Sequence, residues 1–277
     1  MRRSACLLVA AALVFLASPV SADLFSFSTG TPDGRLAAGS RIPDASLIEI
    51  EAADDFITTA NQTNITSASF WGLLPGSTGV GSIAQVDVEI YRVFPKDSVN
   101  PPSGNVPTRV NSPSDVAFAV RDSAVAGQLT FVVATLGPFT AANSVLNGIH
   151  PSPNQTTLGE GPVSGAQVRF DVTFTLPFGL PPDHYFFIPQ VRLSDGSTFF
   201  WLSTLTPPLF TGDLQAWIRN ADLDPDWLRI GTDIIGGATP PRFDMAFSLA
   251  GTEVLEPSTL ALLFGGLPLI AWRRWRG

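Results

Sequence analysis

Two pairs of carboxylates have a spacing that suits acid–base chemistry. Glu49 and Glu51 are two residues apart, and so are Asp87 and Glu89. In a β-strand such residues share a face, with Cα atoms about 6.5 to 7 Å apart. That separation suits the two carboxyl groups of an enzyme that cleaves a glycosidic bond. Any solvated strand face produces the same spacing, however, so we expect these residues to be surface charges.

Three aspartates alternate along one acidic segment, at Asp222, Asp224 and Asp226. Hard cations such as calcium bind carboxylate oxygens from alternate positions of a loop, and Asp233 stands at the twelfth position counted from Asp222. Trp227 follows Asp226 at the sixth position, where the sharp turn of an EF-hand requires Gly. An EF-hand is therefore rejected. We expect a solvated acidic turn, keep another type of calcium loop as the alternative, and assign no metal site.

The remaining motifs favour a protein that is not an enzyme and needs no cofactor. Both histidines, His150 and His184, lie in proline-rich segments, and the sequence contains no HExxH, Walker or GxSxG motif. Gly79 and Gly81 begin a GxGxxA-like string, but it runs into a strand instead of opening a helix, so we interpret it as a turn. Cys6 is the single cysteine, which leaves the rest of the chain without thiol nucleophiles, disulfides or cysteine ligands for zinc.

A sugar-binding surface is predicted around residues 194–197. This segment has Asp-Gly at its centre, a strong signal for a two-residue hairpin turn because such residues tolerate positive φ angles. The predicted register pairs Arg192 with Phe199 and Gln190 with Trp201. These four side chains would share one face, where aromatic rings can stack on the apolar CH surfaces of a sugar. The alternative is that Arg192 or a loop covers the aromatic side chains.

The elements that carry these residues have the hydrophobic pattern of strands. Residues 168–176 alternate strictly between apolar and polar side chains, which is typical of an antiparallel strand with one buried and one solvated face. Helical periodicity is nearly absent, apart from a short turn near residues 141–149. We expect an all-β fold, an antiparallel, jelly-roll-like β-sandwich. The predicted strands cover residues 24–27, 48–51, 65–73, 86–90, 129–134, 168–176, 185–193, 198–202, 214–218, 227–230 and 243–249.

The charge of the body argues against nucleic-acid binding. Of the 16 basic residues, five lie at the two ends of the chain, so the stretch from residue 23 to residue 256 keeps 11 basic and all 24 acidic residues, a net charge of −13. Such a body repels phosphates.

Two proline-rich stretches, residues 96–115 and 150–165, could divide the body into two small sandwiches. We favour one sandwich with long loops, because no internal repeat relates the halves.

The N-terminus predicts a secretory signal peptide. Arg2 and Arg3 precede the apolar run of residues 7–16, and Pro19 and the small residues up to Ala22 follow it. An uncleaved anchor needs about 20 apolar residues, and too few precede Pro19. We therefore expect signal peptidase to remove residues 1–22 by cleavage after Ala22.

The C-terminus carries a second predicted targeting segment. Residues 254–259 precede an apolar stretch, residues 260–272, and an arginine-rich tail, residues 273–277. The apolar stretch has 13 residues, about 20 Å of helix against a hydrocarbon core of about 30 Å. We expect this short transmembrane segment to be held in the membrane only until it is removed, with its basic flank in the cytoplasm.

The motif, the apolar stretch and the arginine cluster together resemble the PEP-CTERM sorting signal of Gram-negative bacteria. The motif residues are Glu256, Pro257 and Ser258, while Leu255 stands where the usual signal has Pro. The resemblance implies that exosortase, a membrane peptidase, processes the tail, and that the protein is associated with exopolysaccharide and biofilm. It covers residues 253–277 and implies nothing about the activity of the body.

These patterns predict three segments: the signal peptide (1–22), the β-sandwich body (23–252) and the sorting signal (253–277). The expected function is that of an exported, exosortase-processed protein of the cell surface or extracellular matrix, structural or adhesive in type. A carbohydrate-binding module is the alternative, and a glycan-cleaving enzyme ranks third. The expected partners are signal peptidase and exosortase during export, the membrane before processing, and an exopolysaccharide.

Overall fold

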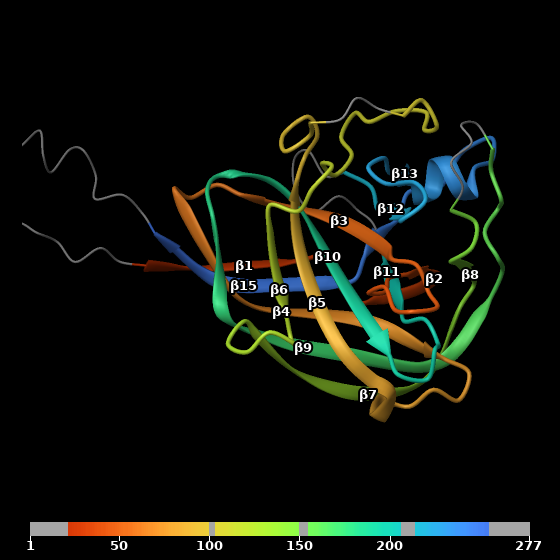
Figure 1. The fold of residues 1–277 in the computed structure, drawn as a ribbon, viewed down its shortest axis with the longest axis horizontal. Helices are drawn as coiled ribbons and strands as arrows, with labels where there is room; N and C mark the ends of the chain where they lie inside the picture. Colours follow the sequence, from red (N-terminus) through yellow and green to blue (C-terminus); the bar gives the residue numbers. More distant parts are fainter. Residues whose placement is uncertain (1–21, 100–102, 150–154, 206–213, 255–277) are drawn as a thin grey trace, which may run out of the picture.

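The computed structural model describes residues 22–99, 103–149, 155–205 and 214–254. The regular secondary structure of the described chain is almost entirely β-strand, arranged as two sheets that pack face to face (Figure 1). The sheets are antiparallel apart from the parallel pairing of β2 with β8. This confirms the predicted all-β sandwich. No helix in the described ranges is long and apolar enough to cross a membrane.

The smaller sheet has six strands and turns one face to the core. In β5 (Ile83–Arg92), Val86 and Val88 are buried in the core, while Asp87 and Glu89 project from the other face. The central neighbouring strands are buried on both faces, so the outer face of this sheet carries charged and polar side chains beside a buried apolar cluster that includes Trp217 and Trp227. The strand order is β13 (Leu228–Arg229), β12 (Trp217–Asn220), β3 (Ile50–Thr58), β10 (Asp183–Leu193), β5 and β6 (Ala119–Asp122).

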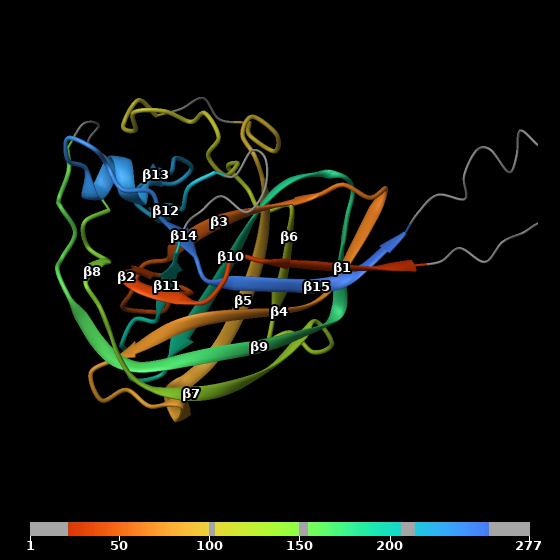
Figure 2. The same ribbon diagram turned by 180° about the vertical axis from the view of Figure 1, so that it is seen from behind.

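The larger sheet has nine strands and carries both ends of the described chain. β1 pairs with β15 along its whole length, from Ala22 opposite Val254 to Ser28 opposite Ser248. The two ends therefore leave the sandwich side by side, remote from β8 and β13 (Figures 1 and 2). The strands are β1 (Ala22–Ser28), β15 (Phe247–Val254), β4 (Gln62–Pro75), β11 (Phe200–Thr204), β2 (Pro32–Gly39) and β8 (Asn143–Val145) in order, with β9 (Val163–Leu180) on β4, β7 (Leu129–Ala141) on β9 and β14 (Asp244–Met245) on β11; η1 (Val80–Ser82) and η2 (Ile230–Ile235) are short helical turns.

Aromatic side chains fill the space between the sheets. The ring of Phe187 from β10 stacks on that of Phe247 from β15, with 5.0 Å between their centroids. Trp201 packs edge-on against Phe247 and donates its Nε1 hydrogen to the carbonyl oxygen of Ala246 at 3.0 Å. Large buried aromatic side chains dominate the energetics of a core. Aromatic residues of β10, β11 and β15 thus hold the two sheets together.

Two local predictions are wrong. Residues 143–145 form the short strand β8, within the stretch where the sequence predicts a helical turn. β10 and β11 do not form the predicted hairpin, because β10 belongs to the smaller sheet and β11 to the larger one. The turn itself is present, with Gly196 at a φ of +77°, and one isolated bridge joins Arg192 to Thr198. Beyond that bridge the chain crosses to the other sheet.

Candidate functional site

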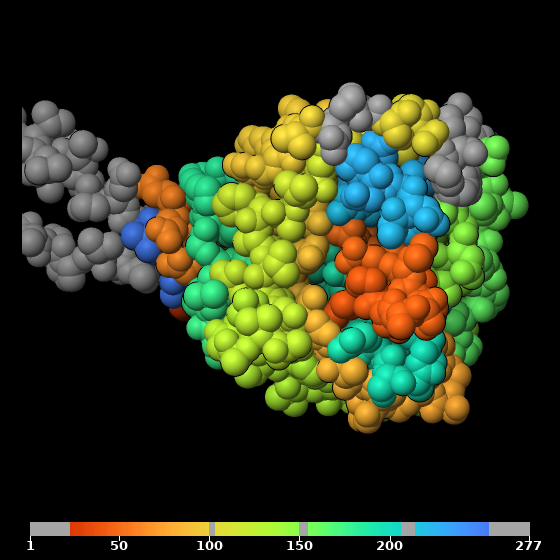
Figure 3. Space-filling view, in the orientation of Figure 1, coloured from red at the N-terminus to blue at the C-terminus, as the bar shows by residue number. Residues whose placement is uncertain are grey.

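The outer face of the smaller sheet brings together the two carboxylate pairs that the sequence singles out. Arg219 of β12 lies opposite Glu51 of β3. Gln190 of β10 lies opposite Asp87 of β5, and Asp87 lies opposite Asp122 of β6. Segments from distant parts of the sequence, coloured orange-red, blue and yellow-green, meet over this side of the molecule (Figure 3). We call this group of residues on β3, β5, β6, β10 and β12 the polar face.

A buried arginine organises the centre of the polar face. Arg219 binds both carboxylate oxygens of Glu51, with Nη2 3.1 Å from Oε1, and donates to the hydroxyl oxygen of Tyr91 at 2.9 Å. Tyr91 in turn donates its hydroxyl hydrogen to Glu51 at 2.8 Å. The guanidinium also lies over the ring of Trp227, 4.4 Å from its centroid. The charge of Glu51 is therefore compensated by hydrogen bonds and an ion pair, which a buried carboxylate requires.

A second buried arginine holds residues 103–115, which we call the covering loop, over the polar face. Arg109 donates to Asp226 at 2.9 Å and forms an ion pair with Asp115, and the side chains of both aspartates are fully buried. Asp226 also accepts hydrogen bonds from the backbone N–H and the hydroxyl of Ser103. The prediction of a solvated acidic turn is therefore wrong for Asp226, because the loop folds back and buries it.

The other members of the acidic segment differ from one another. Asp224 binds Arg219 at 2.7 Å, Asp222 is exposed, and Asp233 forms an ion pair with Arg229 at 2.7 Å. Within the described ranges, no group of three or more histidine, aspartate or glutamate side chains is arranged to hold a metal ion. Asp224, Asp226 and Asp233 each bind an arginine side chain.

Burial changes the protonation of the half-buried carboxyl groups. Burial, together with the nearby carboxylates of Glu51 and Glu49, raises the pKa of Glu89 to about 8. Burial and the facing carboxylate of Asp122 raise the pKa of Asp87 to about 7. Gln85 links that facing pair, because its Nε2 donates to Asp122 at 2.9 Å and to Asp87 at 3.3 Å. At pH 7 the carboxyl group of Glu89 is therefore mostly protonated and that of Asp87 is about half protonated.

The predicted sugar platform is not formed. Trp201 and Phe199 are both 0% exposed and face the core of the sandwich, not an outer surface. Gln190 is also buried and donates to Glu49 at 3.0 Å, while Arg192 is half-buried beside β5. The platform fails because β10 and β11 lie in different sheets, so these four side chains do not share a face.

The structure brings together a histidine and an aspartate that the sequence does not connect. His184 Nε2 is hydrogen-bonded to Asp55 Oδ2, and the other oxygen of Asp55 accepts the N–H of Leu214 at 3.0 Å. Burial raises the pKa of Asp55 against the opposing effect of His184. Neighbouring Asp54 accepts the N–H of Met245 at 2.7 Å. Both aspartates therefore connect β3 to distant segments of the chain. His150 lies outside the described residues.

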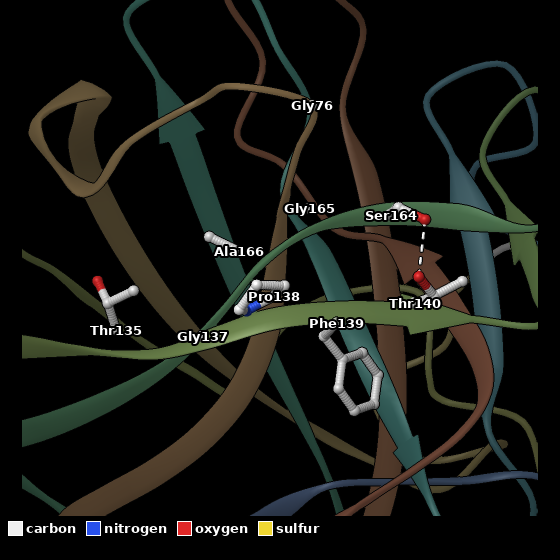
Figure 4. A pocket seen from close by; sticks show the side chains of 9 residues that line it. All are labelled: Gly76, Thr135, Gly137, Pro138, Phe139, Thr140, Ser164, Gly165 and Ala166. Atoms are coloured by element: carbon white, nitrogen blue, oxygen red, sulfur yellow. Dashed lines mark hydrogen bonds between the residues drawn. The ribbon is translucent and has the colours of Figure 1, made fainter.

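A shallow groove on the larger sheet is a weaker candidate. It has a volume of about 650 Å³ and runs along β7 and β9 beside Gly76. Pro138 lies next to Ala166 on the floor, and the hydroxyls of Thr140 and Ser164 are 2.8 Å apart at one end (Figure 4). The lining residues are small or apolar and carry no charge, so the groove offers little for the recognition of a polar ligand.

The predicted export signals lie largely outside the described residues. Ala22 is the first residue of β1, whereas the sorting residues Glu256, Pro257 and Ser258 lie beyond Val254, the last described residue.

No protein-family model matches this chain, and no curated protein matches it significantly. The interpretation of function therefore depends on the geometry of the body and on the predicted signals.

Proposed function

We propose that this chain is an exported β-sandwich protein of the cell surface or extracellular matrix, structural or adhesive in type. The observation that supports the proposal best is the pairing of β1 with β15, which puts Ala22 opposite Val254. The two predicted export segments adjoin these residues. A body attached at this end would direct its other end, with the loop that carries Arg109, away from the attachment point (Figure 2).

The polar face also fits a structural role. Both oxygens of Glu51 are engaged by Arg219, and Asp226 is engaged by Arg109 and Ser103. Carboxylates fixed in this way stabilise the covering loop and are not available to a substrate. Breaking such a buried pair removes compensation for a buried charge, which costs about 3 to 5 kcal/mol.

Surface labelling of intact cells tests the proposal. Asn105→Cys puts a thiol on an exposed loop residue, and a membrane-impermeant maleimide should label this variant when it is exported. Ala216→Cys, at a buried position, is the matched control and should stay unlabelled. Replacing Glu256 and Pro257 together should abolish labelling, because the protein would remain in the inner membrane. Surface protein whose intact mass still includes the C-terminal arginines would contradict the proposed processing.

A second candidate function is cleavage of a glycan. One observation favours it: burial and the nearby Glu51 raise the pKa of Glu89 to about 8, so Glu89 can supply an acid at pH 7. Turnover of a polysaccharide that is lost in Glu89→Gln would establish this activity. Turnover that is absent from the parent protein, or unchanged in the variant, would exclude Glu89 as its acid.

A further inference from the structure

The larger sheet ends on one side in a long strand with an unpaired edge. Within the described ranges, β7 pairs with β9 and with no other strand, and it lies at the margin of the sandwich in both views (Figures 1 and 2). Such an edge presents backbone N–H and C=O groups to which another strand can bind. We call residues 129–135 the β7 edge. Beyond them, a bulge at Gly137 and the missing N–H of Pro138 interrupt it.

The other margins of the two sheets are protected against pairing with another chain. β8, β13 and β14 have only two or three residues each. β6 carries Arg121 and Asp122, and β1 carries Asp23. Short length and charged side chains are usual means of protecting a strand edge. The β7 edge has neither protection, because β7 has 13 residues and lies within a stretch of sequence, residues 123–149, that contains no charged residue.

The side chains of the β7 edge are suited to a further strand. Val132 is 71% exposed, and Phe131 and Val133 are only partly buried against the core. β-branched and aromatic residues of this kind favour strand pairing. A partner strand would remove apolar surface from water, which is favourable.

We propose that the β7 edge pairs antiparallel with the β7 edge of a second copy of this chain, so that the two larger sheets form one continuous sheet. Residues 129–135 are centred on Val132. A two-fold axis through this residue puts Val132 opposite its own copy and Phe131 opposite Val133 of the second copy. Each of these apolar side chains then meets another apolar side chain, as stable cross-strand pairs require.

The distribution of charge supports a second copy as the occupant. Acidic residues outnumber basic ones 24 to 16 in the chain, so two copies repel each other over much of their surface. Contact along the uncharged β7 edge puts no like charges directly opposite each other. This edge also carries no charged group that would select a foreign strand, whereas an identical strand matches it in length and in apolar side chains. The proposal uses only the described body and does not depend on export.

Disulfide formation tests the register directly. In the full-length chain with Cys6→Ser, Val132→Cys introduces a single cysteine, which would face its own copy. Opposed residues of antiparallel strands have Cα atoms about 4.5 to 5.5 Å apart, a separation that permits a disulfide. We expect mild oxidation to give a covalent dimer. Val110→Cys, at a valine of the covering loop that is 69% exposed, is the matched control and should stay monomeric.

Charge substitutions test the pairing without cross-linking. Val132→Lys and Val132→Glu each put like charges opposite each other, and each should raise the dissociation constant of the dimer roughly tenfold or more in sedimentation equilibrium. Both should keep the unfolding temperature of the parent protein, because Val132 is exposed. An equimolar mixture of the two variants should form a mixed dimer, since opposite charges then face each other, and Val110→Lys should dimerise as the parent does.

Three results would each overturn the proposal. They are a parent protein that stays monomeric, a covalent dimer that Val110→Cys forms as readily as Val132→Cys, and a dissociation constant that is unchanged in Val132→Lys.

Discussion

Because the carboxyl groups of Asp87 and Asp122 face each other, we expect the protein to lose stability as the pH rises towards neutrality. The folded state raises the pKa of Asp87 from 3.8 to about 7 through burial and through Asp122. Between these two values the folded chain keeps a proton that the unfolded chain has released. The free energy of unfolding therefore falls with increasing pH across this window. Above pH 7 the folded chain has also released the proton of Asp87, and the stabilisation that this proton provides is lost.

The size of this change in the free energy of unfolding follows from the shift in the pKa of Asp87. A displacement from 3.8 to about 7 corresponds to about 4 kcal/mol at about 1.4 kcal/mol per unit. Asp87 is only half-buried, and solvent screening reduces the effect to about 2 kcal/mol. Asp87→Asn removes the charge but keeps an oxygen that can accept from Gln85, as Asp87 does at 3.3 Å. The variant should match the parent protein at pH 4 and exceed its stability by about 2 kcal/mol at pH 8.

Urea unfolding of both proteins at pH 4, 5, 6, 7 and 8 measures this difference. Asp171→Asn is the control, because Asp171 lies on the outer face of β9 with a side chain 41% exposed. Its stability relative to the parent should change little across the same range. A difference between Asp87→Asn and the parent that is the same at pH 4 and pH 8 would refute the reasoning.

Three further predictions concern the polar face and the core. Glu89→Gln should be more stable than the parent protein at pH 9, and this difference should be smaller at pH 6, because burial raises the pKa of Glu89 to about 8. Urea unfolding of both proteins at the two pH values measures the difference. Arg109→Ala should destabilise the protein by about 3 to 5 kcal/mol, since it removes the partner of buried carboxylates, whereas Arg169→Ala, at an exposed ion pair, should cost about 0 to 1 kcal/mol. Trp201→Ala should cost about 3 to 5 kcal/mol by the same assay, because the side chain is fully buried; a loss below 1 kcal/mol would contradict its place in the core.

The alternation of side chains predicts the strands well, because burial of one face is a local property of the sequence. Residues 168–176 lie within β9, and their alternate apolar side chains face the core as far as Phe174. The predicted hairpin fails for a different reason. The Asp-Gly turn is a local signal and is present, but it does not specify to which sheet the next strand belongs. Phe199 packs against Phe70 and Phe170 of the larger sheet, and these contacts are long-range.

The carboxylates of the polar face are predictable as a set, but their environment is not. Spacing alone puts Asp87 and Glu89 on one strand face. The buried arginines that organise this side come from far away in the sequence: Arg219 is 168 residues from Glu51, and Arg109 is 117 residues from Asp226. Charged residues are ordinarily interpreted as solvated, so no local pattern distinguishes these two arginines from the exposed ones.

The buried ion pairs are connected through the covering loop to a small pocket at the edge of the smaller sheet. Arg109 stands between Thr108 and Val110, and both of these residues line the pocket. The bond of Arg109 to Asp226 therefore fixes one wall of the pocket from behind, and the N–H of Ser112 strengthens the turn by donating to the Arg109 carbonyl oxygen at 3.1 Å. The two buried arginines thus stabilise the loop, because Arg219 also donates to the carbonyl oxygen of Asp115 at 3.2 Å.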